Sequence, residues 1–257
     1  MARILVTGAT RGLGRALVNE LHRRDHQVVA TGRRLADLAD LPATERLVLD
    51  LTDPASIQAA MAAAGKLEVV INNATMTVSG PVEAIPANLV EQVLATNVLG
   101  PLRVMQAVLP TMREQGAGRI LNISSPAGRF APPLEGVYSA SKAALEMLSE
   151  ALRFEAGHFG MQVTIVQPGT IRTELAERQQ RFELPAYASL VSQYAERFAR
   201  YRQRRAPSAE QIAGEIADLL DRRSLPLRVP VGLRSERLFA RLSPSLLGRL
   251  VRSPYKW

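Results

Sequence analysis

Short apolar runs rich in β-branched residues alternate along this chain with longer amphipathic segments. Strands that read as continuous apolar runs, each followed by a helix, are typical of a parallel sheet covered on both faces. We therefore expect a doubly wound α/β fold with about seven strands, its ligand site beyond their carboxyl ends. The expected strands are Ile4–Thr7, Gln27–Thr31, Arg46–Leu49, Glu68–Asn72, Arg119–Ser124, Gln162–Gln167 and Leu227–Val231. The expected helices are Gly12–Arg24, Pro54–Ala64, Pro86–Gln115, Gly136–Phe159, about 175–204 and about 208–222.

Length and composition limit the possible classes of protein. A chain of 257 residues fits one large α/β domain, whose core needs no covalent staples. The absence of cysteine excludes disulfides, a catalytic thiol and cysteine zinc sites. His22, His26 and His158 lack the spacing of metal ligands, so no metal is expected. We expect a cytoplasmic protein, because there is no signal-like N-terminus and no run of roughly 18 or more apolar residues.

The net charge of +8 belongs to the C-terminal quarter. Residues 1–196 contain 18 Lys and Arg against 19 Asp and Glu, whereas residues 197–257 contain 14 against 5. Nucleic-acid binding is not expected, since it more often needs basic charge on the main body as well. Residues 233–257 form a basic amphipathic extension that Pro244 divides into two short helices. We expect it to pack on the domain or form a subunit contact. Weak contact with an anionic membrane surface and polyanion binding are the alternatives.

Three glycines, Gly8, Gly12 and Gly14, follow the first expected strand with the spacing G-x-x-x-G-x-G. Glycines let a backbone approach a phosphate closely, and the N–H groups at the start of the next helix point to the same place. A turn without a ligand is the plain alternative. The position between a strand and a helix favours nucleotide binding.

The segment after the second expected strand favours NADP over NAD. NAD-binding sites usually place an acidic residue there to hold the ribose 2′-hydroxyl. Here the residues are Arg33 and Arg34, and Arg11 lies within the glycine turn. A guanidinium can bind a 2′-phosphate bidentately. Solvated loop charges are the alternative, and the sequence leaves open which of the three arginines dominates.

Tyr138 and Lys142 lie four residues apart in an expected helix, so their side chains share a face. A free phenol has a pKa near 10, and a neighbouring ammonium is expected to lower it. The lysine is informative because the chain contains only two others, Lys66 and Lys256. The pair predicts acid/base chemistry, although an ordinary Tyr–Lys pair on a helix surface has the same spacing.

These motifs occur in an order that resembles the short-chain dehydrogenase/reductase family, in its Y-x-x-x-K branch, over about residues 3–173. The resemblance implies one Rossmann-type domain over residues 1–257 with NADP(H) as cofactor. Asp50-Leu51-Thr52 resembles the adenine-contacting segment, and Asn72-Asn73-Ala74 resembles the family's N-N-A-G, with Thr75 replacing the glycine. The residues that it implies for cofactor binding are Gly8, Thr10, Arg11, Gly12, Leu13, Gly14, Arg33, Arg34, Asp50, Leu51, Asn73, Ala74, Thr75, Tyr138, Lys142, Pro168, Gly169, Ile171 and Thr173.

The resemblance also implies a catalytic tetrad of Asn97, Ser125, Tyr138 and Lys142. Ser125 is preferred to Ser124 because it has the family's usual spacing from Tyr138. Ser125 and Tyr138 would donate hydrogen bonds to the carbonyl oxygen on which negative charge grows, and Tyr138 would supply the proton. Lys142 would hold the nicotinamide ribose, and Asn97 would hold a water that relays protons to Lys142.

The expected reaction interconverts a ketone or aldehyde and an alcohol. The resemblance places a lid over the substrate at about 174–225, and its apolar side chains suit an apolar substrate; the core face of a helix would look the same. These side chains are Leu175, Phe182, Leu184, Tyr187, Leu190, Val191, Tyr194, Phe198 and Tyr201. A homodimer or homotetramer is expected.

Three rival functions remain. A serine hydrolase needs a G-x-S-x-G elbow, which Ser124-Ser125-Pro126 does not provide. An NADP-binding sensor without turnover would lose the tetrad. Epimerases and dehydratases of nucleotide sugars usually have a larger C-terminal substrate domain than this chain.

Overall fold

A seven-stranded parallel sheet forms the centre of the computed structural model, which describes residues 1–173 and 179–232. The strand order is β3-β2-β1-β4-β6-β7-β9, so the order reverses beside β1 and leaves a crevice at the carboxyl ends there. Each expected strand is present to within one residue at either end, and the doubly wound fold class is confirmed. The strands are β1 (Arg3–Val6), β2 (Gln27–Gly32), β3 (Glu45–Val48), β4 (Val69–Asn72), β6 (Gly118–Ile123), β7 (Met161–Pro168) and β9 (Arg228–Val231).

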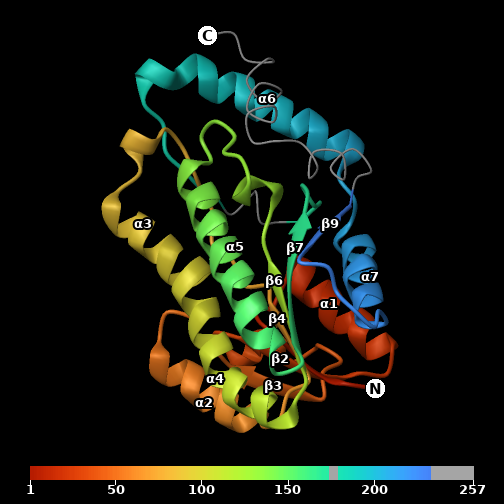
Figure 1. The fold of residues 1–257 in the computed structure, drawn as a ribbon. Coiled ribbons are helices and arrows are strands. Elements are labelled where there is room, and N and C mark those ends of the chain that lie inside the picture. Colours follow the sequence, from red (N-terminus) through yellow and green to blue (C-terminus); the bar gives the residue numbers. More distant parts are fainter. Residues whose placement is uncertain (174–178, 233–257) are drawn as a thin grey trace.

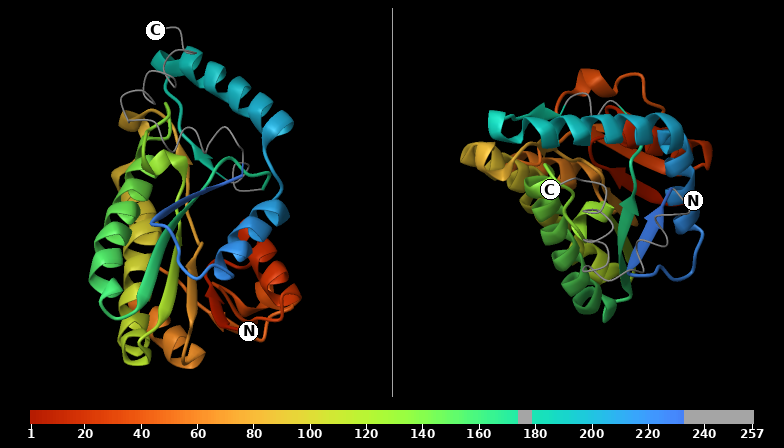
Figure 2. Two further views of the ribbon diagram at one scale, coloured as in Figure 1. Left: turned by 45° about the vertical axis from the view of Figure 1, so that its right-hand side comes forward. Right: turned by 90° about the horizontal axis from the view of Figure 1, so that it is seen from above.

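Helices cover both faces of the sheet (Figure 1; Figure 2). One face carries α1 (Gly12–Arg23) and α7 (Ala209–Leu220), and the other carries α2 (Pro54–Ala64), α4 (Gly100–Gln115) and α5 (Gly136–Gly157). Short 3₁₀ segments occupy Leu35–Leu38, Val82–Ala84, Pro126–Gly128 and Pro185–Tyr187.

Alternate residues of the strands point into two separate hydrophobic cores, one on each face of the sheet. In β1, for example, Ile4 and Val6 face α1 and α7, whereas Leu5 faces α2 and α4. Side chains point to opposite faces along a strand, so a strand that is covered on both faces is apolar throughout. This two-sided burial explains the continuous apolar runs in the sequence, and it holds the carboxyl ends of the strands at a fixed edge.

The expected helix Pro86–Gln115 is interrupted. The structure has α3 (Ala87–Leu94), then a π-helical segment at Ala95–Leu99, and then α4. A π turn adds one residue to the helical repeat and often marks a functional position, and this one contains Asn97. By length and composition alone the helical run Ala87–Gln115 could cross a membrane, a test that the core helix of a protein without membrane spans also passes. Of this run, Val104, Met105, Val108 and Met112 are buried in the core on that face of the sheet.

The expected helix at about 175–204 begins later than predicted. Gln180–Arg181 forms a short strand, β8, which pairs with β5 (Val78–Ser79), and α6 begins only at Ala188 and continues to Arg205. Two-residue strands are too short to leave a periodic pattern in a sequence. In Figure 1, α6 crosses above the carboxyl ends of the sheet, where a substrate lid was expected. Leu175 and the extension 233–257 lie outside the described residues, so the interpretations placed on them stay predictions.

A buried ion pair joins α5 to the last strand. The Glu146 side chain is 1% exposed, and its Oε2 accepts a hydrogen bond of 3.0 Å from Nε of Arg228 on β9. Its Oε1 accepts from Ser124 Oγ at 2.8 Å and from Gln167 Nε2 at 2.7 Å. Arg228 also contacts the more exposed Glu150 at 2.7 Å. Three polar side chains, Ser124, Gln167 and Arg228, thus fix the position of α5 against the sheet.

Replacing Arg228 by Met is expected to lower the free energy of unfolding by about 3 kcal/mol, because buried Glu146 then loses its cation. Glu150→Gln is the control, and it should cost less than about 1 kcal/mol because that partner is 37% exposed. Chemical denaturation of both variants measures the difference. Equal losses would show that Glu146 does not depend on its pairing.

Candidate active site

The predicted site residues all follow the carboxyl ends of strands, at one edge of the sheet or on the helices beside it. The segments that meet there are the turn after β1, the ends of β2, β3 and β4, the π-helical segment, the end of β6, the first turns of α5 and the segment after β7. Parallel strands place their carboxyl ends together. Residues scattered from Gly8 to Thr173 are therefore brought to one edge.

The glycine turn lies directly against the backbone that follows β4. Gly8 has a left-handed φ of +66°, and a Cβ there would lie 2.8 Å from Ala74 Cα. A Cβ on Gly14 would lie 2.1 Å from the carbonyl oxygen of Gly8. Neither position can accept a side chain without moving backbone atoms. The Asn73 side chain holds the turn in place, since its Nδ2 donates to the Thr7 carbonyl at 2.9 Å and to the Gly8 carbonyl at 3.3 Å.

The start of α1 has no side-chain cap from its N-cap residue. Arg11 at the N-cap makes no side-chain hydrogen bond to the helix, and the first turn contains no acidic residue. The N–H groups of a first helical turn need acceptors, and an anion is a good one. A Cβ on Gly12 would lie 3.5 Å from Thr173, so the segment after β7 borders the same place. These features fit a bound pyrophosphate.

The three candidate arginines differ in what they contact. Arg34 forms a bidentate pair with Asp37, with distances of 2.9 and 2.8 Å. Arg11 and Arg33 are exposed, and neither forms a salt bridge within the part of the chain that the structure describes. Arg33 lies close enough to Asp50 to help lower the pKa of that carboxyl, together with two hydrogen bonds from Thr52, against the opposing effect of burial. Arg33 is therefore the arginine beside the predicted adenine-contacting residue.

Several of the residues predicted to bind the cofactor lie in the packed interior of the domain or in its sheet. Leu13 is buried in one core and Leu51 in the other. Pro168 pairs with Val231 in the ladder between β7 and β9, and the Gly169 N–H donates to the Val231 carbonyl at 3.4 Å. Any contact of these residues with a cofactor would come mainly from their backbone atoms. Their roles in cofactor binding stay predictions.

The Asn97 side chain is fully buried and fully engaged. Its Oδ1 accepts from the Met76 N–H at 2.8 Å and from Thr75 Oγ1 at 3.3 Å. Its Nδ2 donates to the Met76 carbonyl at 2.8 Å and to Ser141 Oγ at 3.0 Å. An amide has two donors and two acceptor lone pairs, so this one has no capacity left. A water beside Asn97 would have to be held by its main-chain carbonyl.

Ser125 and Tyr138 meet as predicted. Ser125 ends the segment after β6 and hydrogen-bonds the side chain of Tyr138, which lies in the first turn of α5. The expected lowering of the Tyr138 pKa is wrong for this structure. Burial of the phenol raises its pKa well above the usual value and outweighs the Ser125 hydrogen bond, and nearby Glu135 raises it further. The phenol therefore rests in its protonated form, ready to donate.

Lys142 lies beneath that phenol. Its side chain is 2% exposed, and Nζ lies 5.8 Å from the centre of the Tyr138 ring. Burial lowers the Lys142 pKa to about 8, although Glu146 opposes the shift. Nζ donates 2.8 Å to the Ile123 carbonyl, and the described residues offer no acceptor for its other two protons. Hydroxyl groups of a ribose would supply such acceptors, which fits the predicted role.

Two residues of this site were missed by the sequence reading. Ser141 connects Asn97 to α5, and it also donates to the Tyr138 carbonyl at 2.7 Å. Glu146 lies one helical turn beyond Lys142 and opposes the loss of its charge. Glu146 lies four residues after Lys142 and Ser141 three residues after Tyr138, and residues at these spacings share a helix face, so this much was visible in the sequence. Their partners on other elements were not.

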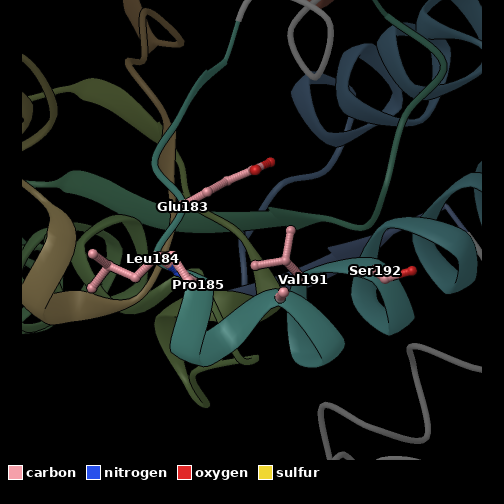
Figure 3. Close-up of a pocket in the computed structure, with 6 residues that line it drawn as sticks. Glu183, Leu184, Pro185, Val191 and Ser192 are labelled. Carbon is pink, nitrogen blue, oxygen red and sulfur yellow. The ribbon is translucent and has the colours of Figure 1, made fainter.

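A pocket of about 460 Å³ lies at the start of α6, formed by the residues just before this helix and by its first turns; Figure 3 shows the residues around it. Its lining residues are Glu183, Leu184, Pro185, Ala188, Val191 and Ser192. Leu184 and Val191 of the predicted lid are thus among the residues that line this pocket, and the lid itself stays a prediction. Phe182 instead packs on the small core around Val78 and Val137, as a core residue would.

Comparison with known proteins agrees with this geometry. The family model described as short chain dehydrogenase matches residues 2–184. A 3-ketodihydrosphingosine reductase from Bacteroides thetaiotaomicron is 33% identical over 248 residues, covering 93% of this chain and 90% of that protein. A solved short-chain dehydrogenase from Streptomyces avermitilis is 33% identical, with a TM-score of 0.85 and coverage of 98% and 96%.

A second solved structure, a short-chain dehydrogenase from Burkholderia cenocepacia in complex with NADP, is 25% identical, with a TM-score of 0.79 and coverage of 98% and 96%. The match to the family model covers most of the chain, and the residues of the site fit a dinucleotide. This chain belongs to the short-chain dehydrogenase/reductase family and is an oxidoreductase that acts on carbonyl or alcohol groups with a nicotinamide cofactor.

Proposed function

We propose that this protein is an NADP(H)-dependent reductase or dehydrogenase that interconverts a carbonyl and an alcohol on a largely apolar substrate. The observation that carries the proposal is the arrangement of Ser125, Tyr138 and Lys142 around one point at the carboxyl edge of the sheet. A cytoplasmic location and a homodimeric or homotetrameric state stay predictions.

The hydroxyl groups of Ser125 and Tyr138 would bind the oxygen of the substrate carbonyl. As that carbon is reduced, negative charge develops on the oxygen, and fixed donors stabilise it most where they need no reorganisation. Tyr138 then gives its proton to the oxygen as general acid. The raised Tyr138 pKa ensures that this proton is present at neutral pH. A bound nicotinamide would supply the hydride, or accept it in the reverse direction.

Lys142 would replace the proton that Tyr138 gives up. With a pKa of about 8, it can release and regain a proton near neutral pH more readily than an ordinary lysine. The ammonium would also favour the phenolate that forms for a moment during turnover. Asn97 acts as a positioning residue in this proposal, because its side chain ties the Met76 backbone to Ser141 on α5.

The choice of NADP rests on the end of β2. The exposed guanidinium of Arg33 lies beside the Asp50 segment, where the adenine ribose is expected. A 2′-phosphate there would gain a bidentate partner, and the described residues leave Arg33 without a salt bridge of its own. Arg11, at the start of α1, is the second candidate for the same phosphate.

Tyr138→Phe is expected to lower turnover by at least about a hundredfold, since it removes a positioned general acid. A panel of ketones and aldehydes, assayed with NADPH and NADH, measures activity. Unchanged melting and unchanged NADPH fluorescence on binding are the controls for fold and cofactor site. Near-normal turnover in the variant would remove Tyr138 from the mechanism.

Lys142→Met should change how stability depends on pH. The Lys142 pKa is about 8 when folded and 10.5 in the ordinary state, so between these values the unfolded chain binds the extra proton. Stability of the wild type should therefore rise with pH across this window relative to the variant. At about 1.4 kcal/mol for each pKa unit, the rise amounts to roughly 3 kcal/mol at most. Urea unfolding of both proteins from pH 7 to 10.5 measures it. Parallel curves would contradict the assignment of a buried, depressed lysine.

Arg33→Asp is expected to weaken NADPH far more than NADH, because it places a carboxylate where the 2′-phosphate is expected. The ratio of kcat/KM with NADPH to kcat/KM with NADH should fall by at least about tenfold, which corresponds to about 1.4 kcal/mol. Arg222→Asp, an equal charge change on an exposed residue away from this edge, is the control. If this ratio does not change, Arg33 does not bind the 2′-phosphate, and Arg11 is the next candidate for that role.

A further inference from the structure

A carboxylate lies one helical turn before the catalytic tyrosine. Glu135 is the N-cap of α5, and its carbonyl accepts the Ser139 N–H at 2.8 Å, which closes the first turn. Residues three apart share a helix face, so Glu135 and Tyr138 face the same way. The carboxylate is close enough to raise the pKa of the phenol. Glu135 is therefore a candidate to contact a substrate that Tyr138 holds.

The described part of the lid segment gives this carboxylate two neutral hydrogen-bond donors. Gln179 Nε2 donates to Oε1 at 3.3 Å, and the Tyr194 hydroxyl of α6 donates to the same oxygen at 3.1 Å. Glu135 forms no salt bridge within residues 1–173 and 179–232. Burial raises its pKa to about 7, against the opposing effects of Gln179, Tyr194 and the charge of Arg181. Among the described residues this half-buried carboxylate has no salt-bridge partner, and such a group is costly if its role is only structural.

The backbone before Glu135 is strained. Leu134 has a left-handed φ of +66°, which is rare for a bulky side chain. Its side chain is 8% exposed, and its carbonyl accepts the Gly80 N–H at 2.8 Å. Strain of this kind is costly and tends to occur at ligand sites. Here it turns the chain so that Glu135 begins α5 beneath the lid.

We propose that Glu135 is a specificity-determining residue that accepts a hydrogen bond from a hydroxyl or ammonium group carried by the substrate near its reacting carbonyl. The inference rests on the proposed carbonyl/alcohol chemistry and narrows its substrate class to hydroxy or amino ketones with an apolar remainder. The donor would lie between the first turn of α5 and α6, while Ser125 and Tyr138 hold the carbonyl oxygen.

The chemistry of the site explains this preference. A buried carboxylate gains most from a donor that replaces lost water, and a charged donor gives the strongest hydrogen bond. Gln179 and Tyr194 are long-range partners from the lid, and their bonds of 3.3 and 3.1 Å are longer than a charge-assisted hydrogen bond. A plain ketone would bring no donor to Glu135, and a site built around a polar partner discriminates against such an analogue.

The test compares three ketones of equal chain length: a plain ketone, its α-hydroxy form and its α-amino form. The wild type should have a kcat/KM at least about tenfold higher for the hydroxy or amino ketone than for the plain one. Glu135→Gln should cut the amino-to-plain ratio about tenfold, because an amide cannot pair with the ammonium charge. Glu135→Leu should cut both the amino and hydroxy ratios, because it can accept no hydrogen bond.

Glu155→Gln is the matched control, since it removes the same charge from an exposed position on the same helix; the ratios should not move. If the Glu135 variants lower activity on all three ketones equally, Glu135 only holds the lid or acts through Tyr138, and the inference fails. If the wild type reduces the plain ketone as well as the others, it also fails, while the proposed function stands. If the wild type reduces no ketone with either cofactor, the proposed function fails and takes this inference with it.

Discussion

The active site depends on a stripe of buried hydrogen bonds between α5 and the sheet. Ser141 holds Asn97, Lys142 donates to the end of β6, and Glu146 binds Ser124. Two turns further, the Ser149 hydroxyl accepts from Asn122 Nδ2 at 2.8 Å, and Asn122 Oδ1 accepts from Asn72 Nδ2 at 2.8 Å. Apolar packing alone tolerates small slips of a helix, whereas buried polar pairs are satisfied in only one register. The stripe therefore sets where Tyr138 stands relative to Ser125.

This arrangement lowers the stability of the fold in order to hold the side chains of the active site in fixed positions. A lysine that is 2% exposed and loses its charge more readily than usual is held in an environment that disfavours its protonated form. About two turns earlier, at the start of the same helix, lie the strained Leu134 and Glu135, a carboxylate with no salt bridge among the described residues. Such features persist only where the surrounding structure holds them in place. The two apolar cores, one on each face of the sheet, provide the stability that offsets their cost. The costs are concentrated at the carboxyl edge, where the chemistry is proposed to occur.

Much of the fold could be predicted because the strands and the glycine turn produce recognisable local patterns in the sequence. Two-sided burial makes each strand apolar, and the glycine turn is marked because Gly8 and Gly14 lie against backbone. The pairing of β5 with β8, the π-helical segment and the Glu146–Arg228 ion pair were not predictable in this way. Each depends on partners far apart in the sequence, and none produces a periodic pattern of apolar residues in the sequence. The direction of the Tyr138 pKa was wrong for the same reason, since spacing reveals a neighbouring charge but not how much water burial removes.

Two carboxylates flank the Tyr138–Lys142 pair on α5, and their surroundings give them different capacities. Glu146 has a guanidinium on one oxygen and two neutral donors on the other, so it has little left to offer a ligand. Among the described residues Glu135 has only neutral donors, both from the lid side, and its pKa is about 7. Environment rather than residue type assigns the roles of paired carboxylates. One therefore anchors the helix to the sheet, and the other remains available to a substrate that brings its own donor.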